Sequence, residues 1–392
     1  MKLRRLLLQV HLWLGLTTGA VVAVVCATGA VLAFEDEIGR ALHPAWYHVK
    51  PHGARLPLDA AIARANTVLG EGRVTGVTVH ADPARALELR LDGEDGAADR
   101  AFADPYTGRM LGRYRSDATF FHLTEDVHRR LLAGEVGKRV VGVSTVAFLV
   151  ILASGAVLWW PRGRRGLRAR LTVRARAGWK RLAHDLHVSL GVYAVGFLFV
   201  MAFSGLVWAF KWFEDGIYTV TRTAKHDATP PPSVYRPGAT PAPLDAAFRT
   251  ARGALGAAAT YTITLPKDSA AALAVRAVPH GAPHPRATDA VFLDAYTGAV
   301  VKLDRYGDRS LGARTRAAFY PLHVGSMGGL TTRVLYFLAC VLGATFPVTG
   351  ALIWFNKRSA RWRKRWDARR AARPAAPGTS REVPAGTDRV EA

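Results

Sequence analysis

Four long stretches without a charged side chain constrain what this chain can fold into. Residues 6–34, 140–160, 188–210 and 334–355 contain no Asp, Glu, Lys or Arg. Each is long enough to cross a bilayer, since a helix needs about 20 apolar residues to span a hydrocarbon layer of about 30 Å. The first stretch is also longer than the apolar core of a cleaved signal peptide. The sequence therefore predicts four retained transmembrane helices in a lipid bilayer.

Basic side chains gather at the ends of these stretches and predict their orientation. Lys2, Arg4 and Arg5 precede the first stretch, nine basic and no acidic residues lie from Arg162 to Arg181, and "NKRSARWRKRWDARR" follows the fourth. Lys and Arg are enriched in short loops on the cytoplasmic side of a membrane. We therefore expect both termini and the central loop on the cytoplasmic side, with the two longer segments outside. This topology also accounts for the net charge of +23, so no nucleic-acid partner is predicted.

The chain is an internal duplication. Placing His11 over His187 brings "HLWLG" over "HVSLG" and "TGAVLAF" over "SGLVWAF". Placing His128 over His323 brings "SGAVLWW" over "TGALIWF". The external segments match as well, because each contains "PLDAA", and "DPYTG" in the first corresponds to "DAYTG" in the second. A unit of helix, external segment and helix thus occurs twice.

Each external segment predicts a small α+β domain. In the first, "PLDAAIARANTVLG" has apolar residues at helical spacing, and "RVTGVTVH" and "ALELRLDG" alternate as strands do. The second repeats this pattern after a proline-rich linker at 228–243. The expected fold class is a membrane α-helical bundle of four transmembrane helices with two small α+β domains outside the membrane. In chain order we expect helix 1 (6–34), domain 1 (35–120), an external lead-in with helix 2 (121–160), a basic loop (161–183), helix 3 (184–210), domain 2 (211–318), an external lead-in with helix 4 (319–356) and a basic, disordered tail (357–392).

Four histidines occupy matching positions in the two copies. His11 and His187 stand at the cytoplasmic entry of the first and third helices, and His128 and His323 stand near the external ends of the second and fourth. Ionisable groups in membrane helices are uncommon and tend to be functional. Two imidazoles from different helices suit axial ligation of haem iron. Neutral imidazole also binds zinc or copper, and a histidine can simply anchor a helix end in the headgroup layer.

Further residues are open to a second interpretation. His122 and His184 are substitutes for the proposed ligands, because the sequence around His128 is polar and His184 lies one helical turn before His187. The glycines of the repeated "TGA" and "SGA" motifs are expected to let helices pack closely. Cys26 and Cys340 both fall inside predicted helices, so no disulfide is expected in the external domains.

With these features the chain resembles the PepSY-associated transmembrane family, which includes iron-regulated membrane proteins. The resemblance is carried by "HLWLG" and "HVSLG", by "VHRRLLAGEVG" before "SGAVLWWPR", by "LHVGSMGG" before "TGALIWF" and by the two D-x-Y-T-G turns, over about residues 5–360. It implies a ferric-siderophore reductase of the bacterial inner membrane, with two haem b groups and periplasmic PepSY-like domains. Carried over by motif, the axial ligands of the haem irons are His11, His187, His128 and His323.

The resemblance and the two predicted depths of the histidines imply a route for electrons. They would enter from a cytoplasmic donor or the quinol pool, and leave toward a ferric siderophore or another external acceptor. Two other classes of function stay open. One is a non-enzymatic membrane anchor or sensor whose PepSY domains bind a peptide or envelope protein, and the other is an accessory component of iron or siderophore transport. Candidates for partners of the haem propionates are Arg4, Arg5, Arg129, Arg130 and Arg181.

Overall fold

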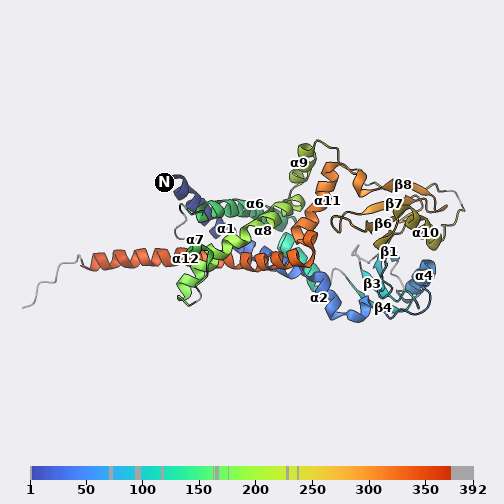
Figure 1. Cartoon of the computed structure of the whole chain (residues 1–392), viewed down its shortest axis with the longest axis horizontal. Coiled ribbons are helices and arrows are strands. Elements are labelled where there is room, and N and C mark those ends of the chain that lie inside the picture. The colour runs from blue at the N-terminus through green and yellow to red at the C-terminus, as the bar shows by residue number, and fades with distance from the viewer. Residues whose placement is uncertain are drawn as a thin grey trace, which may run out of the picture.

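Four long apolar helices form a bundle with a β-sheet at one end. The computed structural model describes residues 2–69, 74–92, 99–115, 119–161, 163, 167–174, 176–226, 229–235 and 238–371. Within these residues four helices are long and apolar enough to cross a membrane. Figure 1 shows them side by side, with the N-terminus at the end opposite the sheet. They are α1 (Lys2–Leu32), α6 (Gly134–Trp159), α8 (Trp179–Ala209) and α12 (Gly329–Ala371).

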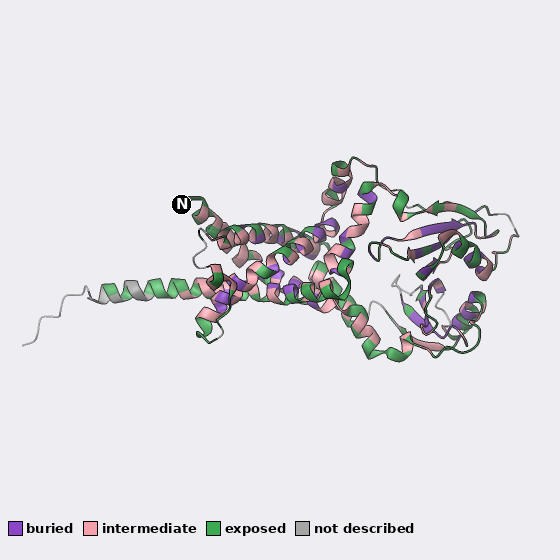
Figure 2. Cartoon of the chain, viewed as in Figure 1, coloured by how far each residue is buried: buried purple, intermediate pink, exposed green. Residues whose placement is uncertain are grey.

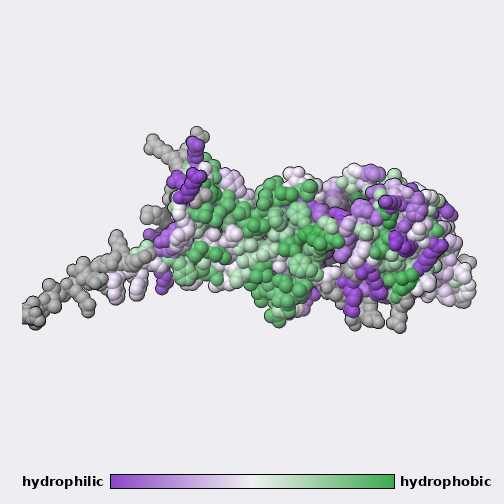
Figure 3. Space-filling view, turned by 90° about the horizontal axis from the view of Figure 1, so that it is seen from below, coloured by the Kyte–Doolittle hydropathy of each residue, from purple (hydrophilic) through white to green (hydrophobic). Residues whose placement is uncertain are grey.

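Apolar side chains cover both the outside and the inside of this bundle. Val143 is 61% exposed and Leu338 is 49% exposed, as expected where a helix faces lipid rather than water. In Figure 3 the hydrophobic surface covers the bundle and gives way to polar surface at both ends. Inside, Val22, Leu152 and Leu198 belong to one buried cluster. The predicted fold of four membrane helices carrying α+β regions is confirmed.

Helices α1 and α12 cross closely through small residues. A Cβ on Gly343 would lie 2.8 Å from Sγ of Cys26, and a Cβ on Gly29 would lie 3.6 Å from Sγ of Cys340. Each cysteine therefore packs against a glycine of the opposite helix, which allows the two backbones to approach. Both cysteines lie inside helices, as the sequence predicted, and both are buried and free.

Short helices lead into the second and fourth long helices. Thr119 caps α5 (Phe120–Arg130) and Ser310 caps α11 (Leu311–Val324), each accepting a backbone N–H with its hydroxyl oxygen. Left-handed residues end both, Leu131 at φ 51° and Gly325 at φ 72°. Helix α5 then packs on α1, and α11 packs on α8. The remaining helices are α2 (Glu35–Leu42), α3 (Pro44–Tyr47), α7 (Leu167–Leu171), α9 (Lys211–Thr221) and the 3-10 helices η1 (Tyr306–Asp308) and η2 (Ser326–Gly328).

The two segments that were predicted to lie outside the membrane share one antiparallel sheet of eight strands, in the order β4-β3-β2-β1-β5-β6-β7-β8. Strands β1 and β5 join the halves, with Val77 opposite Ile263. Each segment thus contributes four strands, and the sheet is continuous where the sequence predicted two small domains. The strands are β1 (Val74–His80), β2 (Leu87–Leu91), β3 (Arg100–Ala103), β4 (Met110–Tyr114), β5 (Ala258–Thr264), β6 (Leu273–Pro279), β7 (Asp289–Leu293) and β8 (Val300–Asp304).

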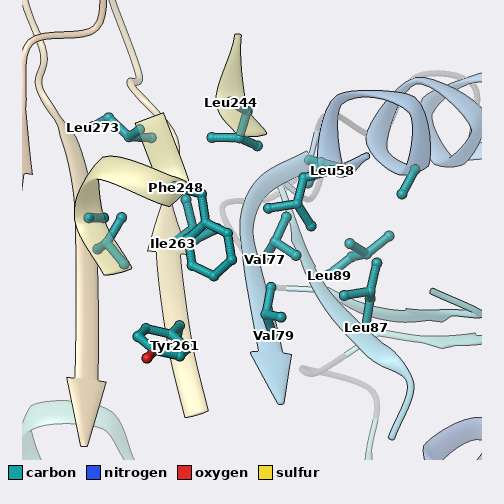
Figure 4. Packing of buried hydrophobic residues seen from close by; sticks show 14 of the residues in the cluster. Leu58, Val77, Val79, Leu87, Leu89, Leu244, Phe248, Tyr261, Ile263 and Leu273 are labelled. Atoms are coloured by element: carbon teal, nitrogen blue, oxygen red, sulfur yellow. The ribbon is translucent and has the colours of Figure 1, made fainter. Parts of the chain in front are cut away.

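One helix from each segment packs on the sheet over a common core. The helices are α4 (Leu58–Leu69) and α10 (Leu244–Leu255). Figure 4 shows their leucines pointing toward Val77, Leu89 and Ile263 of the strands. The helix starts are tied together, because Asp59 accepts the backbone N–H of Leu244 at 3.0 Å. Figure 2 shows buried residues in the strands and in these two helices, as well as along the helix bundle.

The two D-x-Y-T-G motifs are structural turns at the ends of β3 and β7. Oδ1 of Asp104 accepts the backbone N–H of Tyr106 at 2.8 Å, and Oδ1 of Asp294 accepts that of Tyr296 at 3.0 Å. The final glycines have φ of 73° and 68°, a left-handed conformation that other residues rarely adopt. The motif therefore forms the tight turn between two neighbouring strands, and this structural role accounts for its residues.

Helix α12 extends into the segment that was predicted to be a disordered tail. Helix α12 continues to Ala371, because residues 357–371 consist largely of Arg, Lys, Ala and Trp, and the first three are strong helix formers. The expectation of disorder from residue 357 is therefore wrong for this part. Residues 372–392 lie outside the described residues.

Candidate functional site

Two pairs of histidine rings face each other in the bundle. His11 of α1 and His187 of α8 have ring centroids 6.2 Å apart, with their planes at 89°. His128 of α5 and His323 of α11 also have centroids 6.2 Å apart, with their planes at 69°. We call the first the tail-side pair, because it lies toward the end with the N-terminus, and the second the sheet-side pair. Each copy of the duplicated unit contributes one ring to each pair.

Each ring is held through Nδ1 by a neighbouring helix. His11 Nδ1 lies 3.1 Å from the carbonyl oxygen of Ile151 and 3.1 Å from Oγ of Ser154, both on α6. The other three rings have the same two kinds of partner, a carbonyl and the hydroxyl three residues later. These are Phe346 (3.1 Å) and Thr349 (3.1 Å) for His187, Val25 and Thr28 (3.1 Å) for His128, and Met201 (2.9 Å) and Ser204 (3.2 Å) for His323.

These contacts fix which ring nitrogen carries the hydrogen. A carbonyl oxygen only accepts, so Nδ1 must donate. The Ser154 hydroxyl donates to the Ile151 carbonyl of its own helix at 3.0 Å, which leaves its oxygen to accept from His11. Nε2 of each ring then carries a lone pair, and it forms no hydrogen bond to any residue that the structure describes. All four rings thus present the form of imidazole that binds a metal.

A glycine follows each hydroxyl-bearing residue and lies beneath the ring. A Cβ on Gly155 would lie 3.1 Å from Cε1 of His11. Such a distance is closer than ordinary van der Waals contact, so glycine leaves the room that the ring occupies. The corresponding distances are 3.0 Å for Gly350 and His187, 3.1 Å for Gly29 and His128, and 3.2 Å for Gly205 and His323.

These glycines were predicted to serve helix packing, and their contacts with the histidine rings were not predicted. The signal is nevertheless present in the sequence. In the first helix of each copy, the Ser or Thr lies 17 residues after the histidine, as in His11 and Thr28 or His187 and Ser204. Between the histidine of the lead-in helix and the Ser or Thr of the following long helix, the spacing is 26 residues in each copy. A matched spacing in both copies distinguishes these motifs from other small residues in the helices.

The donor set fits a cofactor that needs two axial nitrogens. Metal–imidazole bonds are about 2.0–2.1 Å long, so two in line place the nitrogens about 4 Å apart. With the ring radii added, this is close to the observed centroid spacing of 6.2 Å. A structural zinc site takes four protein ligands, and no group of three or more His, Cys, Asp or Glu converges among the described residues. Two neighbouring imidazoles from different helices favour a macrocycle such as haem, which supplies the other ligands itself.

The sheet-side pair lies in a buried, aromatic environment. The Trp208 ring centroid is 5.3 Å from that of His323. Burial lowers the pKa of His128 to about 4 and also lowers the pKa of His323. Both rings are therefore neutral at pH 7, as metal ligation requires.

The residues named as substitutes stand apart from both pairs. His122 is exposed on α5, and Nδ1 of His184 lies 3.3 Å from the carboxylate of Asp185. Most of the arginines named as propionate partners are already bonded to the protein. Arg4 donates to the carbonyl of Leu158, Arg129 pairs with Glu125, Arg130 pairs with Asp126 and Arg181 pairs with Asp185.

Comparison with known proteins agrees with this architecture. The model of the family described as "PepSY-associated TM region" matches residues 8–357, which include the four histidines and run from the first long helix into the fourth. No curated protein matches the chain. The match covers nearly the whole chain, so this protein belongs to the PepSY-associated TM family.

Proposed function

We propose that this protein is a dihaem b-type membrane protein that carries electrons across the inner membrane of a bacterium to an external acceptor. The acceptor class we favour is chelated ferric iron, such as a ferric siderophore, whose reduction would release iron for uptake. The observation that carries the proposal is the pair of facing imidazoles at each end of the bundle, with Nδ1 bonded and Nε2 free.

The four histidines would hold the two haems as axial ligands. Haem, when bound, supplies reversible one-electron chemistry at its iron. The tail-side haem would lie between His11 and His187, and the sheet-side haem between His128 and His323. His11 and Thr28, which holds His128, are 17 residues apart on α1, or about 26 Å at 1.5 Å per residue. That separation would place one haem toward each face of the membrane.

The apolar side chains would keep water out of the bundle, and the basic residues at one end support its orientation in the membrane. Apolar residues such as Val22, Leu152 and Leu198 fill the bundle between the pairs. The basic tail-side end, with Lys2, Arg4 and Arg5, supports a cytoplasmic position for that end. A cytoplasmic or quinol donor would then reduce the tail-side haem, and the shared sheet would lie in the periplasm beside the acceptor.

Absorption spectroscopy tests this proposal directly. The full chain, expressed with adequate haem supply and purified in detergent, should show a Soret band and sharp α-bands on reduction. Haem extraction should give about two haems per chain, one for each pair. Addition of a ferric chelate to the reduced protein should restore the oxidised spectrum. A protein without any haem absorption would favour the alternative hypothesis of a membrane anchor or sensor.

A further inference from the structure

We propose that the four Ser/Thr–Gly pairs are positioning elements that lock the axial histidines in one tautomer and one ring plane. This inference rests on the proposed function, because it concerns how the chain prepares its haem ligands. The residues do not touch the iron and act only through the histidines. They are Thr28–Gly29, Ser154–Gly155, Ser204–Gly205 and Thr349–Gly350.

Each hydroxyl group is oriented by a hydrogen bond within its own helix. Thr28 donates to the Val24 and Val25 carbonyls of its own helix, at 2.7 and 3.1 Å. Hydroxyls in membrane helices commonly form such bonds, so this feature alone assigns no role. Each of the four, however, also lies 3.1–3.2 Å from a histidine Nδ1. Because its hydrogen is already used, the hydroxyl oxygen can only accept, and it therefore favours the Nδ1–H tautomer.

The glycine completes this support by leaving room for the Cε1 edge of the ring against the helix. The carbonyl, the hydroxyl and the glycine occupy one helical face, at positions i, i+3 and i+4. The first two contact Nδ1, and the missing Cβ leaves room for Cε1. A ring fixed at two adjacent atoms has little freedom to rotate.

The supporting contacts cross between the two helices of each copy. Helix α1 carries His11 of the tail-side pair, yet its Thr28 holds His128 of the sheet-side pair. Helix α6 follows α5, which carries His128, yet its Ser154 holds His11. The second copy repeats this arrangement with α8, α11 and α12. Each copy thus orients one ligand of each haem by itself, and the pairs form where the copies meet.

This arrangement predicts that a substitution on one helix affects the haem that the histidine of the same helix does not bind. Removing the Thr28 hydroxyl should change the haem at the sheet side and leave the haem bound by His11, on the same helix, unchanged. Hydrogen bonding at Nδ1–H raises the basicity of the ligand and favours ferric iron. Loss of the hydroxyl should therefore raise the reduction potential of the sheet-side haem. A tenfold change in relative affinity for the two oxidation states corresponds to about 59 mV for one electron.

The experiment is a spectroelectrochemical titration of the full-length holoprotein carrying Thr28→Val. The same titration with His187→Ala, which lacks a tail-side ligand, identifies the sheet-side haem. Thr18→Val is the matched control, because Thr18 donates to the Leu14 carbonyl on the same helix at 2.8 Å and forms no hydrogen bond to a histidine in the described part of the chain. Thr28→Ser keeps the hydroxyl and should keep the wild-type potential.

The expected result is a positive shift of one potential in Thr28→Val, and none in Thr18→Val or Thr28→Ser. Equal shifts of both haems, or a Thr28→Val titration identical to that of Thr18→Val, would overturn the positioning role. If Thr28→Val fails to fold, the corresponding substitutions of Ser154 decide the question. Ser154→Ala should then shift the potential of the tail-side haem, while Ser154→Thr and Thr28→Ser should keep the wild-type potentials. Wild-type protein without haem would instead reject the proposed function itself.

Discussion

His11 Nδ1 and Ser154 Oγ lie 3.1 Å apart although 143 positions separate them in the chain. This contact joins the first helix of the first copy to the second helix of that copy. Its counterpart in the second copy joins His187 to Thr349, also at 3.1 Å. The two copies meet where the rings of His11 and His187 face each other. The tail-side pair is therefore a property of the packed duplication, and neither copy alone contains it.

Replacing His187 with Ala should remove one of two haems. The substitution leaves His11 as the only imidazole of the tail-side pair, so that site loses an axial ligand. We expect haem extracted per chain to fall from about two to about one, measured by the pyridine haemochromogen assay. His184→Ala is the control, because His184 contacts Asp185 and belongs to neither pair. Retention of both haems in His187→Ala would contradict the assignment of this ligand.

Gly350→Ala should weaken the tail-side site without unfolding the protein. The new Cβ would lie 3.0 Å from His187 Cε1, so the ring must shift by a few tenths of an ångström. Overpacking of this kind costs about 1–3 kcal/mol, and disturbed support of a metal ligand lowers affinity about 10- to 100-fold. Haem loss to apomyoglobin measures the change. Gly191→Ala, one turn after His187 with nothing within 4 Å, should lose haem at the wild-type rate.

The membrane helices could be predicted from the sequence because their signal is local. An uncharged run such as 188–210 determines its own helix, and α8 contains all of it except the last residue. The duplication then matched His11 with His187 and His128 with His323, and the structure brings these residues together. The alignment of the two copies was enough to predict these pairs. Equivalent residues of two copies that pack against each other lie at the same depth in the bundle.

The supporting contacts could not be predicted in the same way. A Ser–Gly pair such as Ser154–Gly155 has the composition of a helix-packing motif, and only the neighbouring helix decides whether a histidine lies there. The continuous sheet was missed for a related reason. Pairing of Val77 with Ile263 is non-local, and each segment alone has the pattern of a complete small domain. In both cases the partner was set by the tertiary fold.

Electron paramagnetic resonance should detect the crossed ring planes. The planes of His11 and His187 are 89° apart, and those of His128 and His323 are 69° apart. Perpendicular imidazoles act equally on two iron orbitals, which leaves these orbitals nearly equal in energy and makes the low-spin ferric signal strongly anisotropic. We expect two such signals from the oxidised protein, with the tail-side signal absent in His187→Ala. Rhombic signals typical of parallel imidazoles would show that the rings rotate when haem binds.

Asp304 should make the junction between the sheet and α11 sensitive to acid. Burial alone would raise the pKa of Asp304, but hydrogen bonds from Arg309 at 3.0 Å and His226 at 3.0 Å together lower it below the ordinary value of 3.8. A carboxyl group with a lowered folded-state pKa stabilises the fold above pH 4, and that contribution disappears as pH falls through the folded-state pKa. Asp304→Asn should therefore cost about 1–3 kcal/mol at pH 7, and the difference from wild type should shrink below pH 4. Thermal unfolding of the full chain in detergent, followed by circular dichroism, measures this. The exposed Asp308→Asn should match wild type at every pH, and a pH-independent loss in Asp304→Asn would contradict the role of its charge.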